Sequence, residues 1–375
     1  MIRELVWKPD FSQTVDRFAA WWSGDVLDRP PVTMTVNSAS PAPIPPYEKM
    51  LDGHFLSVRD VVDAEIDRLS QFDYVGDTYP IFRMGLGPEL TSTLFIEEYQ
   101  NDQHISQFHK SSGEKLVVFP PVVDDCLTWQ RLIDTRSEVR QRFNRGRWDF
   151  AQQVIRAAID QSAGRYIVGL PNLYGPYDTL AALREPLALC LDLIDCPDMV
   201  QQAAWFVLAE LTTVRDIFWR QIRAAGFGSA GWIPAYSEEA VGLLSCDFWG
   251  LLAPSTVETL IMPIIEQEME PFNYSLFHLD GPLALNHLDL LLNLPKLDAI
   301  QWDFGPGQGP AVQWLELYRR ILAADKSVQV LAEDVADALT VLQALGPKGI
   351  WLTIKQPFIS RTEAEYFLNE IATNS

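Results

Sequence analysis

Basic residues and cysteines are scarce in this sequence. Its 375 residues include 29 Lys and Arg against 50 Asp and Glu, which gives a formal net charge of −21. Nucleic acids and anionic membranes bind cationic surfaces, so we expect neither as a partner. The 4 cysteines, Cys126, Cys190, Cys196 and Cys246, form no Cys-x-x-Cys pair, and this spacing predicts reduced thiols in a cytosolic protein.

Long apolar runs and targeting signals are also missing. No run approaches the ~18 apolar residues of a transmembrane helix. The first ten residues, 1–10, contain no apolar stretch followed by a small-residue cleavage site, so we expect a cytoplasmic protein. Apolar residues make up 48% of the chain and aromatic residues 11%, which predicts a large core and no extended disorder.

Signature motifs of several enzyme classes are absent as well. The sequence has no Gly-x-Ser-x-Gly elbow, no Walker loop and no zinc knuckle, which removes support for seryl hydrolases, phosphoryl transferases and zinc fingers. The segment 305–310 comes closest to a dinucleotide-binding Gly-x-Gly-x-x-Gly turn, but its two prolines make that function unexpected.

Strands and helices instead alternate regularly from about residue 165 onward. The predicted strands are Arg165–Leu170, Gly228–Tyr236, Tyr274–Leu279, Leu297–Phe304, Val328–Leu331 and Gly349–Ile354. The predicted helices between and after them are 186–225, 254–271, 283–292, 310–324, 334–345 and 361–372. Serial βα units indicate a parallel sheet, so we expect α/β class and a single (β/α)8 TIM-type barrel over residues 1–375, with an open doubly wound sheet as the alternative.

The N-terminal part predicts two additions to that barrel. The first ~30 residues have the pattern of a helical layer that ends before Pro30, and Val32–Val36 reads as a strand. A further helix is expected at 57–72. Residues 92–120 alternate in the β manner, so we expect an antiparallel excursion there.

Catalytic groups of parallel barrels lie at the carboxyl ends of the strands, and this rule selects candidates. His278 and Asp280 lie two residues apart at one strand end and therefore face the same side. Imidazole and carboxylate suit Zn2+ or another divalent ion, and the remaining candidate ligands are Asp303, Glu333 and Cys246. The alternative is that Asp280 caps the helix beginning near Pro282, with or without orienting His278.

Other polar residues are candidates for contact with a substrate. Asp77 could hold a cationic or NH-bearing substrate, or simply form an Asx turn before Thr78. Tyr236 could donate to a substrate carboxylate or act as a general acid. The remaining predicted substrate-binding residues are Ser237, Tyr177, Trp302, Gln301 and Lys355. Ser237 could instead cap a helix, and Lys355 could be a buried base, an anion clamp or a solvated side chain at a strand end.

Several segments, in this order, resemble the uroporphyrinogen decarboxylase superfamily, in particular its decarboxylase-like branch. They are Arg29–Val32, Leu183–Pro186, Asp195–Asp198, Leu252–Ser255, His278–Asp289 and Ile300–Trp302 with the Gly-Pro-Gly loop that follows. The resemblance spans about residues 15–370 and implies one (β/α)8 barrel. The superfamily contains tetrapyrrole decarboxylases and zinc-dependent methyltransferases that pass methyl groups between a corrinoid protein and a thiol.

The two branches make different demands on the sequence. Authentic uroporphyrinogen decarboxylation is not expected, because Asn37–Pro41 stands where that family carries its arginine-rich segment. The methyltransferases carry His-x-Cys at a strand end, where this chain has His278-x-Asp280. A His/Asp site is harder and suits water, alcohol or carboxylate substrates better than thiols.

The resemblance therefore favours a metal-assisted methyltransferase-type enzyme with one Zn2+ per chain and a small-molecule substrate. A corrinoid would come only on a separate protein, because the Asp-x-His-x-x-Gly signature is absent. The alternatives are a metal-free decarboxylase or lyase acting on a small or tetrapyrrole-like carboxylate, and a non-catalytic binding barrel. Barrels of this superfamily often pair, so a homodimer stays open.

Overall fold

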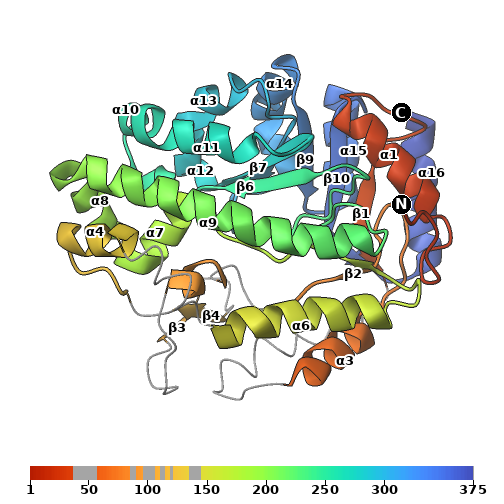
Figure 1. Ribbon diagram of the computed structural model, residues 1–375. Coiled ribbons are helices and arrows are strands. Elements are labelled where there is room, and N and C mark those ends of the chain that lie inside the picture. The colour runs from red at the N-terminus through yellow and green to blue at the C-terminus, as the bar shows by residue number, and fades with distance from the viewer. Residues whose placement is uncertain are drawn as a thin grey trace.

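A computed structural model of the chain describes residues 1–36, 57–84, 90–95, 106–109, 115–118, 121–134 and 145–374. Within them a parallel sheet is flanked by helices, which confirms the α/β class (Figure 1). The segment Asn37–Pro41 and parts of the range 92–120 lie outside the described residues.

Six parallel strands form the main sheet. In spatial order they are β1 (Val32–Val36), β10 (Ile350–Phe358), β9 (Ser327–Ala332), β8 (Ala299–Asp303), β7 (Tyr274–Asp280) and β6 (Val241–Ser245). Each of the last four strands lies beside the strand that precedes it in the chain, as expected when every crossover is a helix of similar length. Because the strands are parallel, their carboxyl ends share one edge of the sheet.

Two short sheets lie apart from it. β2 (Ile81–Phe82) pairs in parallel with β5 (Ile167–Val168), and β3 (Ser106–His109) pairs antiparallel with β4 (Lys115–Val118). The expected β alternation from residue 92 is wrong at its start, because Ser92–Phe95 forms the 3-10 turn η2.

The expected closed eight-stranded barrel is wrong, and in the described residues the antiparallel excursion expected over 92–120 is limited to the β3–β4 pair. The sheet is a six-stranded half-barrel with a separate parallel pair. The segment before β2 bonds to β1 through Asp77 N to Val32 O, and the segment after β5 bonds to the loop before β6 through Leu170 N to Ala230 O. The run Gly228–Tyr236, expected as a strand, contributes only an isolated antiparallel bridge between Ser229 and Ser237. Pro234 has no N–H to donate to a ladder, and Gly231 weakens a strand, which accounts for this break.

Helices cover the outer face of the strands. Those of the first half are α1 (Phe11–Trp22), α3 (Val58–Leu69), α4 (Cys126–Asp134), α6 (Arg145–Gln161), α7 (Pro176–Arg184), α8 (Pro186–Asp195) and α9 (Pro197–Ala224). Those of the second half are η4 (Asp247–Leu251), α10 (Pro254–Thr256), η5 (Val257–Ile261), α11 (Met262–Met269), α12 (Gly281–Ala284), η6 (Leu285–His287), α13 (Leu288–Leu292), η7 (Ala311–Trp314), α14 (Leu315–Ala323), α15 (Val335–Leu345) and α16 (Arg361–Asn374). None of the helices in the described residues is both long and apolar enough to cross a membrane.

Helix α1 packs against the amino ends of the strands. Trp21 donates through Nε1 to the carbonyl of Gly349, directly before β10, and its own carbonyl accepts from Ser327, the first residue of β9. The rings of Trp21 and Trp351 lie 5.5 Å apart. The sheet is thus covered at its amino end, which leaves the carboxyl ends of β6, β7 and β8 for a site (Figure 1).

Candidate functional site

Three side chains that can ligate a metal converge at the carboxyl ends of β6 and β7. They are Asp247, His278 and Asp280, and one ligand atom from each lies within 4.8 Å of the others. Both aspartates are exposed and the histidine is half-buried. Two of the five predicted ligands, His278 and Asp280, are therefore together, and Asp247 is an addition.

The backbone explains why His278 and Asp280 meet. Both lie in β7 two residues apart, so their side chains leave the strand on the same side. Asp280 occupies the position before α12, but its side chain makes no capping hydrogen bond to that helix. The helix-capping alternative for Asp280 is thus wrong.

Asp247 is held in place by Asp178, a buried carboxyl group at the start of α7. Asp178 accepts hydrogen bonds from Ser245 Oγ at 3.3 Å and from the backbone N–H of Phe248 at 3.0 Å. Ser245 precedes Asp247 in the sequence and Phe248 follows it, so both ends of the turn that carries Asp247 are bonded to Asp178. Burial, together with the negative charge of Asp247, raises the pKa of Asp178 to about 7.

His278 is fixed from two directions. Its Nδ1 lies 2.5 Å from Oε1 of Gln301 on β8, and Gln301 in turn donates through Nε2 to Oε1 of Gln329 at 2.6 Å. The Trp232 ring packs edge-on against the imidazole, with centroids 5.0 Å apart. Because an amide oxygen only accepts, Nδ1 is the donor in this contact, and in the neutral imidazole Nε2 then presents its lone pair.

The other predicted metal ligands lie outside this group of three. Asp303 is the register partner of Asp280 on the neighbouring strand, but its Oδ1 accepts from the backbone N–H of Gly305 at 3.0 Å. Glu333 is exposed and lies against Gly309, where an added Cβ would collide with its carboxylate. Cys246 is a buried free thiol whose pKa is raised by burial, so it is held as SH.

Asp77 belongs to the opposite end of the sheet. It is fully buried, and its carboxylate accepts from Arg17 at 3.1 Å, from Arg29 at 2.6 Å and from the backbone N–H of Val32 at 2.8 Å. Val32 begins β1, so these contacts join the amino end of the sheet to α1. They give no support to a substrate-binding role at the carboxyl edge.

Tyr236 and Ser237 also lie before a strand rather than after one. Tyr236 is fully buried, with its ring 5.0 Å from that of Phe11 in α1, and Ser237 Oγ accepts from the backbone N–H of Glu239. Both residues precede β6. Their prediction as substrate residues depended on a strand at 228–236 that the structure does not contain.

Three further predicted substrate residues are engaged in packing or lie beside the Gly-Pro loop. Tyr177 is buried and donates to the carbonyl of Leu260 at 2.9 Å. Trp302 points to the face of β8 opposite Gln301 and packs on Trp314, 5.0 Å away, in the helical layer. Lys355 is exposed at the carboxyl edge, with its ammonium nitrogen 4.3 Å from the centroid of the Phe304 ring.

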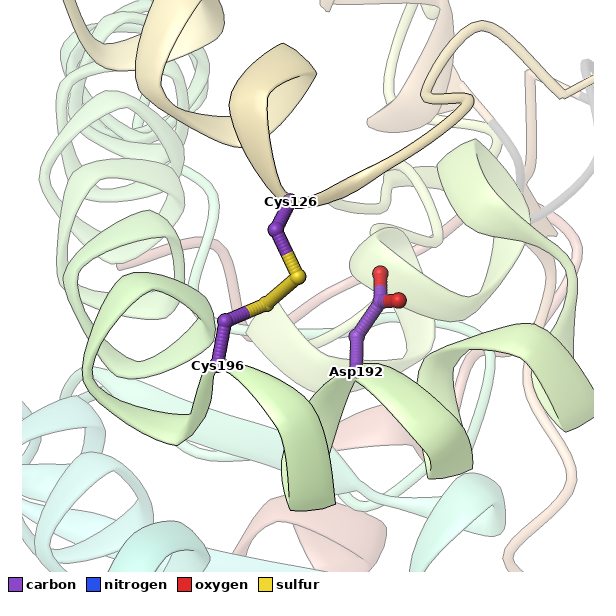
Figure 2. Close-up of side chains that lie close together, drawn as sticks. All are labelled: Cys126, Asp192 and Cys196. Carbon is purple, nitrogen blue, oxygen red and sulfur yellow. A yellow bond between two sulfur atoms is a disulfide. The ribbon is translucent and has the colours of Figure 1, made fainter.

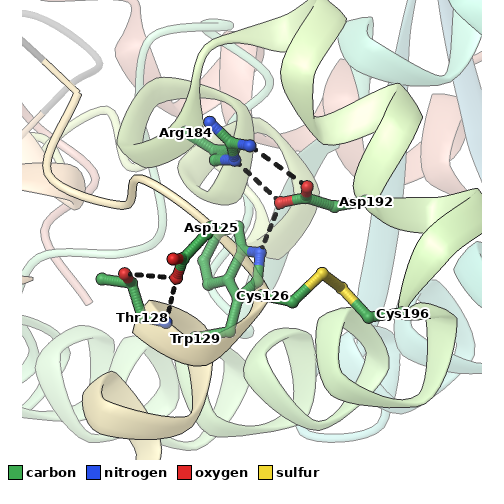
Figure 3. The surroundings of a disulfide bond; sticks show 7 residues. All are labelled: Asp125, Cys126, Thr128, Trp129, Arg184, Asp192 and Cys196. Atoms are coloured by element: carbon green, nitrogen blue, oxygen red, sulfur yellow. Dashed lines mark hydrogen bonds and ion pairs between the residues drawn. A yellow bond between two sulfur atoms is a disulfide. The ribbon is translucent and has the colours of Figure 1, made fainter.

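A second group of potential ligands, Cys126, Asp192 and Cys196, has a structural role (Figure 2). The two cysteines form a disulfide between α4 and the α8–α9 junction. Asp192 accepts from Arg184 Nε at 2.8 Å, Arg184 Nη2 at 3.2 Å and Trp129 Nε1 at 2.8 Å (Figure 3). Its oxygens therefore already have donors.

The disulfide corrects the expectation of four reduced thiols. A separation of 70 residues between the paired cysteines gives no signal in the sequence, because the pairing depends on how α4 folds onto α8. The argument for a cytosolic compartment from cysteine spacing no longer holds, since disulfides persist mainly in oxidising surroundings. Cys190 and Cys246 are free.

Sequence reasoning missed Asp247 because it missed the strand before it. The run Val241–Ser245 is apolar apart from its last residue and is followed by Cys246 and Asp247, which is the pattern of a buried parallel strand with a polar end. With β6 placed there, Asp247 would have been found by the same rule that selected His278.

Among solved structures, the chain is similar to a methyltransferase from Methanosarcina mazei. The alignment covers 96% of this chain and 98% of that chain with a TM-score of 0.56 and 11% sequence identity. At that identity the similarity shows a shared fold. Comparison with family models and with curated proteins gives no match.

Proposed function

We propose that this chain is a methyltransferase-type enzyme of the uroporphyrinogen decarboxylase-like kind, assisted by one divalent metal held by Asp247, His278 and Asp280. The observation that carries the proposal is the convergence of these three ligand groups at the carboxyl edge of β6 and β7. The whole-length similarity to a methyltransferase supports the reaction class.

The residues present fit a catalytic divalent metal. Catalytic zinc sites have three protein ligands and keep one position for water or substrate. Here the two carboxylates are exposed, which leaves a side open to solvent, and the imidazole is oriented by Gln301 as metal-bound histidines usually are. Bound Zn2+ would supply Lewis acidity that polarises an oxygen of the substrate.

The protein groups perform the remaining tasks. Gln301 and Trp232 hold the imidazole, and because Nδ1 is engaged by Gln301, Nε2 is the nitrogen available to a metal. Asp178 fixes the turn that presents Asp247, through its bonds to Ser245 and Phe248. Lys355 at the same edge offers a positive charge to a substrate carboxylate.

The ligand set favours an oxygen substrate. Two carboxylates and one imidazole are harder than the His/Cys sets that activate thiols, so we propose a water, alcohol or carboxylate acceptor. The methyl donor would be a corrinoid on a separate protein or a small molecule. The metal-free decarboxylase alternative loses ground, because Asp77 and Tyr236 are engaged at the other end of the sheet.

A methyl-transfer assay tests the proposal. Chelator-treated protein should not demethylate a methylated corrinoid in the presence of an alcohol or carboxylate acceptor, and added Zn2+ should restore turnover. His278→Ala should abolish the restored turnover, whereas Asp303→Asn, a matched change of a carboxylate outside the group, should retain it. Equal turnover with and without metal in folded protein would contradict the proposal.

A further inference from the structure

Polar side chains join five neighbouring strands in a continuous hydrogen-bonded chain. From His278 on β7 it runs to Gln301 on β8 at 2.5 Å and to Gln329 on β9 at 2.6 Å. Gln329 then donates to Thr353 on β10 at 2.8 Å, and Thr353 lies 2.7 Å from Thr33 on β1. The chain starts at the proposed metal group and ends near the opposite edge of the sheet.

Strand register places these residues on one side of the sheet. His278, Gln301 and Gln329 are consecutive register partners, and Thr353 is the register partner of Thr33. Gln301 is 8% exposed and Gln329 is 2% exposed. A buried amide without hydrogen-bond partners destabilises the fold, so adjacent glutamines inside a sheet are tolerated because they satisfy one another.

The series of hydrogen bonds from His278 to Thr33 has a direction. Each glutamine accepts through its oxygen on the His278 side and donates through its nitrogen on the Thr33 side. Trp351, whose indole can only donate, donates to Thr33 Oγ1 at 3.1 Å, so the Thr33 end of this series of hydrogen bonds also receives a donor. With this polarity, the atom that faces His278 is always an acceptor.

We infer that Gln301, Gln329 and Thr353 are positioning residues that fix His278 as the Nδ1–H tautomer with the Nε2 lone pair directed at the site. The inference rests on the proposed function for its use: a metal requires an unprotonated Nε2, and an oriented acceptor on Nδ1 supplies it. The remote residues act because they prevent the Gln301 amide from rotating its NH2 toward the imidazole.

The tautomer can be read in metal-free protein by ring-nitrogen NMR. The chain has 5 histidines, so the signals of His278 are assigned by comparison with His278→Gln. At about pH 8.5, above the ordinary histidine pKa of ~6.5, Nδ1 should show the shift of a protonated nitrogen and Nε2 that of an unprotonated one. Gln301→Leu should lose this preference, and Gln301→Glu, which keeps the acceptor, should retain it.

The part of the hydrogen-bond series farthest from His278 is tested by two substitutions of Thr353. Thr353→Val removes the hydroxyl and should weaken the tautomer preference, while Thr353→Ser keeps it and should restore the wild-type spectrum. Binding of Zn2+ alone should weaken about 10–100-fold in Gln301→Leu, the range found when partners of metal-bound histidines are removed.

An Nε2–H tautomer in the wild type, or identical spectra in wild type and folded Gln301→Leu, would overturn the inference. If the Nδ1–H form is present and is lost in Gln301→Leu while neither protein binds Zn2+, the inference stands and the proposed metal function falls.

Discussion

The Nδ1 atom of His278 and the Oε1 atom of Gln301 lie 2.5 Å apart across β7 and β8. The pair links the exposed edge of the sheet, where Asp247 and Asp280 lie, to the buried interior, where Gln329 continues the contact. The site therefore includes residues that no substrate would touch.

Asp178 is expected to influence the metal site without being a ligand. Asp178→Ala removes the acceptor for Phe248 N–H and Ser245 Oγ, so the turn that carries Asp247 should loosen. We expect Zn2+ affinity to fall by about 10-fold, at the low end for indirect contacts. Asp178→Asn keeps one acceptor oxygen and should lose less. Equal affinity in wild type and Asp178→Ala, measured by competition with a chromogenic chelator, would remove Asp178 from the account.

Asp77 is expected to matter for stability and not for chemistry. Asp77→Asn leaves the buried Arg17 and Arg29 without their shared carboxylate, which should cost about 3–5 kcal/mol of unfolding free energy in urea denaturation. The exposed pair of Arg59 and Asp63 is the control, and Asp63→Asn should change stability by less than about 1 kcal/mol. Loss of turnover in folded Asp77→Asn, with stability unchanged, would instead favour the decarboxylase alternative.

Much of the strand pattern could be predicted from the sequence. Val32–Val36 was predicted with its bounds, and the strands from Tyr274 onward lie within a few residues of their predicted ranges. Their apolar runs are short, bounded by turn residues and separated by helical periodicity, so local pattern and tertiary role agree. The single helix predicted over 186–225 is two helices, α8 and α9. Pro197 has no backbone N–H, so the helical hydrogen bonds of α8 end at Asp195.

The rest depended on contacts that no local pattern records. Gly228–Tyr236 has the apolar content of a strand, but Gly231 and Pro234 prevent pairing, and this error moved Tyr236 and Ser237 to the wrong end of the sheet. His278 and Asp280 were identified because alternation along one strand is local. Asp247 was missed together with β6, the strand before it, whereas the Gln301–Gln329 contact requires knowledge of which strands are neighbours.

Reduction of the disulfide is expected to destabilise the protein. Cys126 and Cys196 are 70 residues apart in the sequence, and the loop between them includes β5 and the α7 segment that carries Asp178. By the chain-entropy relation, loss of the disulfide should lower the free energy of unfolding by about 4 kcal/mol. Cys126→Ser should lower the midpoint of thermal unfolding, and dithiothreitol should have no further effect on it. Cys190→Ser is the control, because Cys190 is free. An unchanged midpoint in Cys126→Ser would contradict this.

His287 is expected to make stability depend on pH. It is fully buried with Nε2 donating to the carbonyl of Trp249 at 3.0 Å, and burial lowers its pKa below the usual 6.5. The unfolded chain therefore binds the proton more readily, so the contribution is present above pH ~6.5 and is lost as the pH falls below it. The free-energy difference between wild type and His287→Gln should shrink between about pH 7 and pH 5. A constant difference over that window would exclude the effect.

The central claim is that Asp247, His278 and Asp280 together hold one divalent metal, and the most direct test is titration of metal-free protein with Zn2+ by calorimetry. The account predicts about one site per chain, weakened at least about 10-fold in Asp247→Asn and in Asp280→Asn, and unchanged in Asp303→Asn. Absence of a site in folded wild-type protein, or an Asp247→Asn variant that binds Zn2+ as tightly as the wild type, would contradict it.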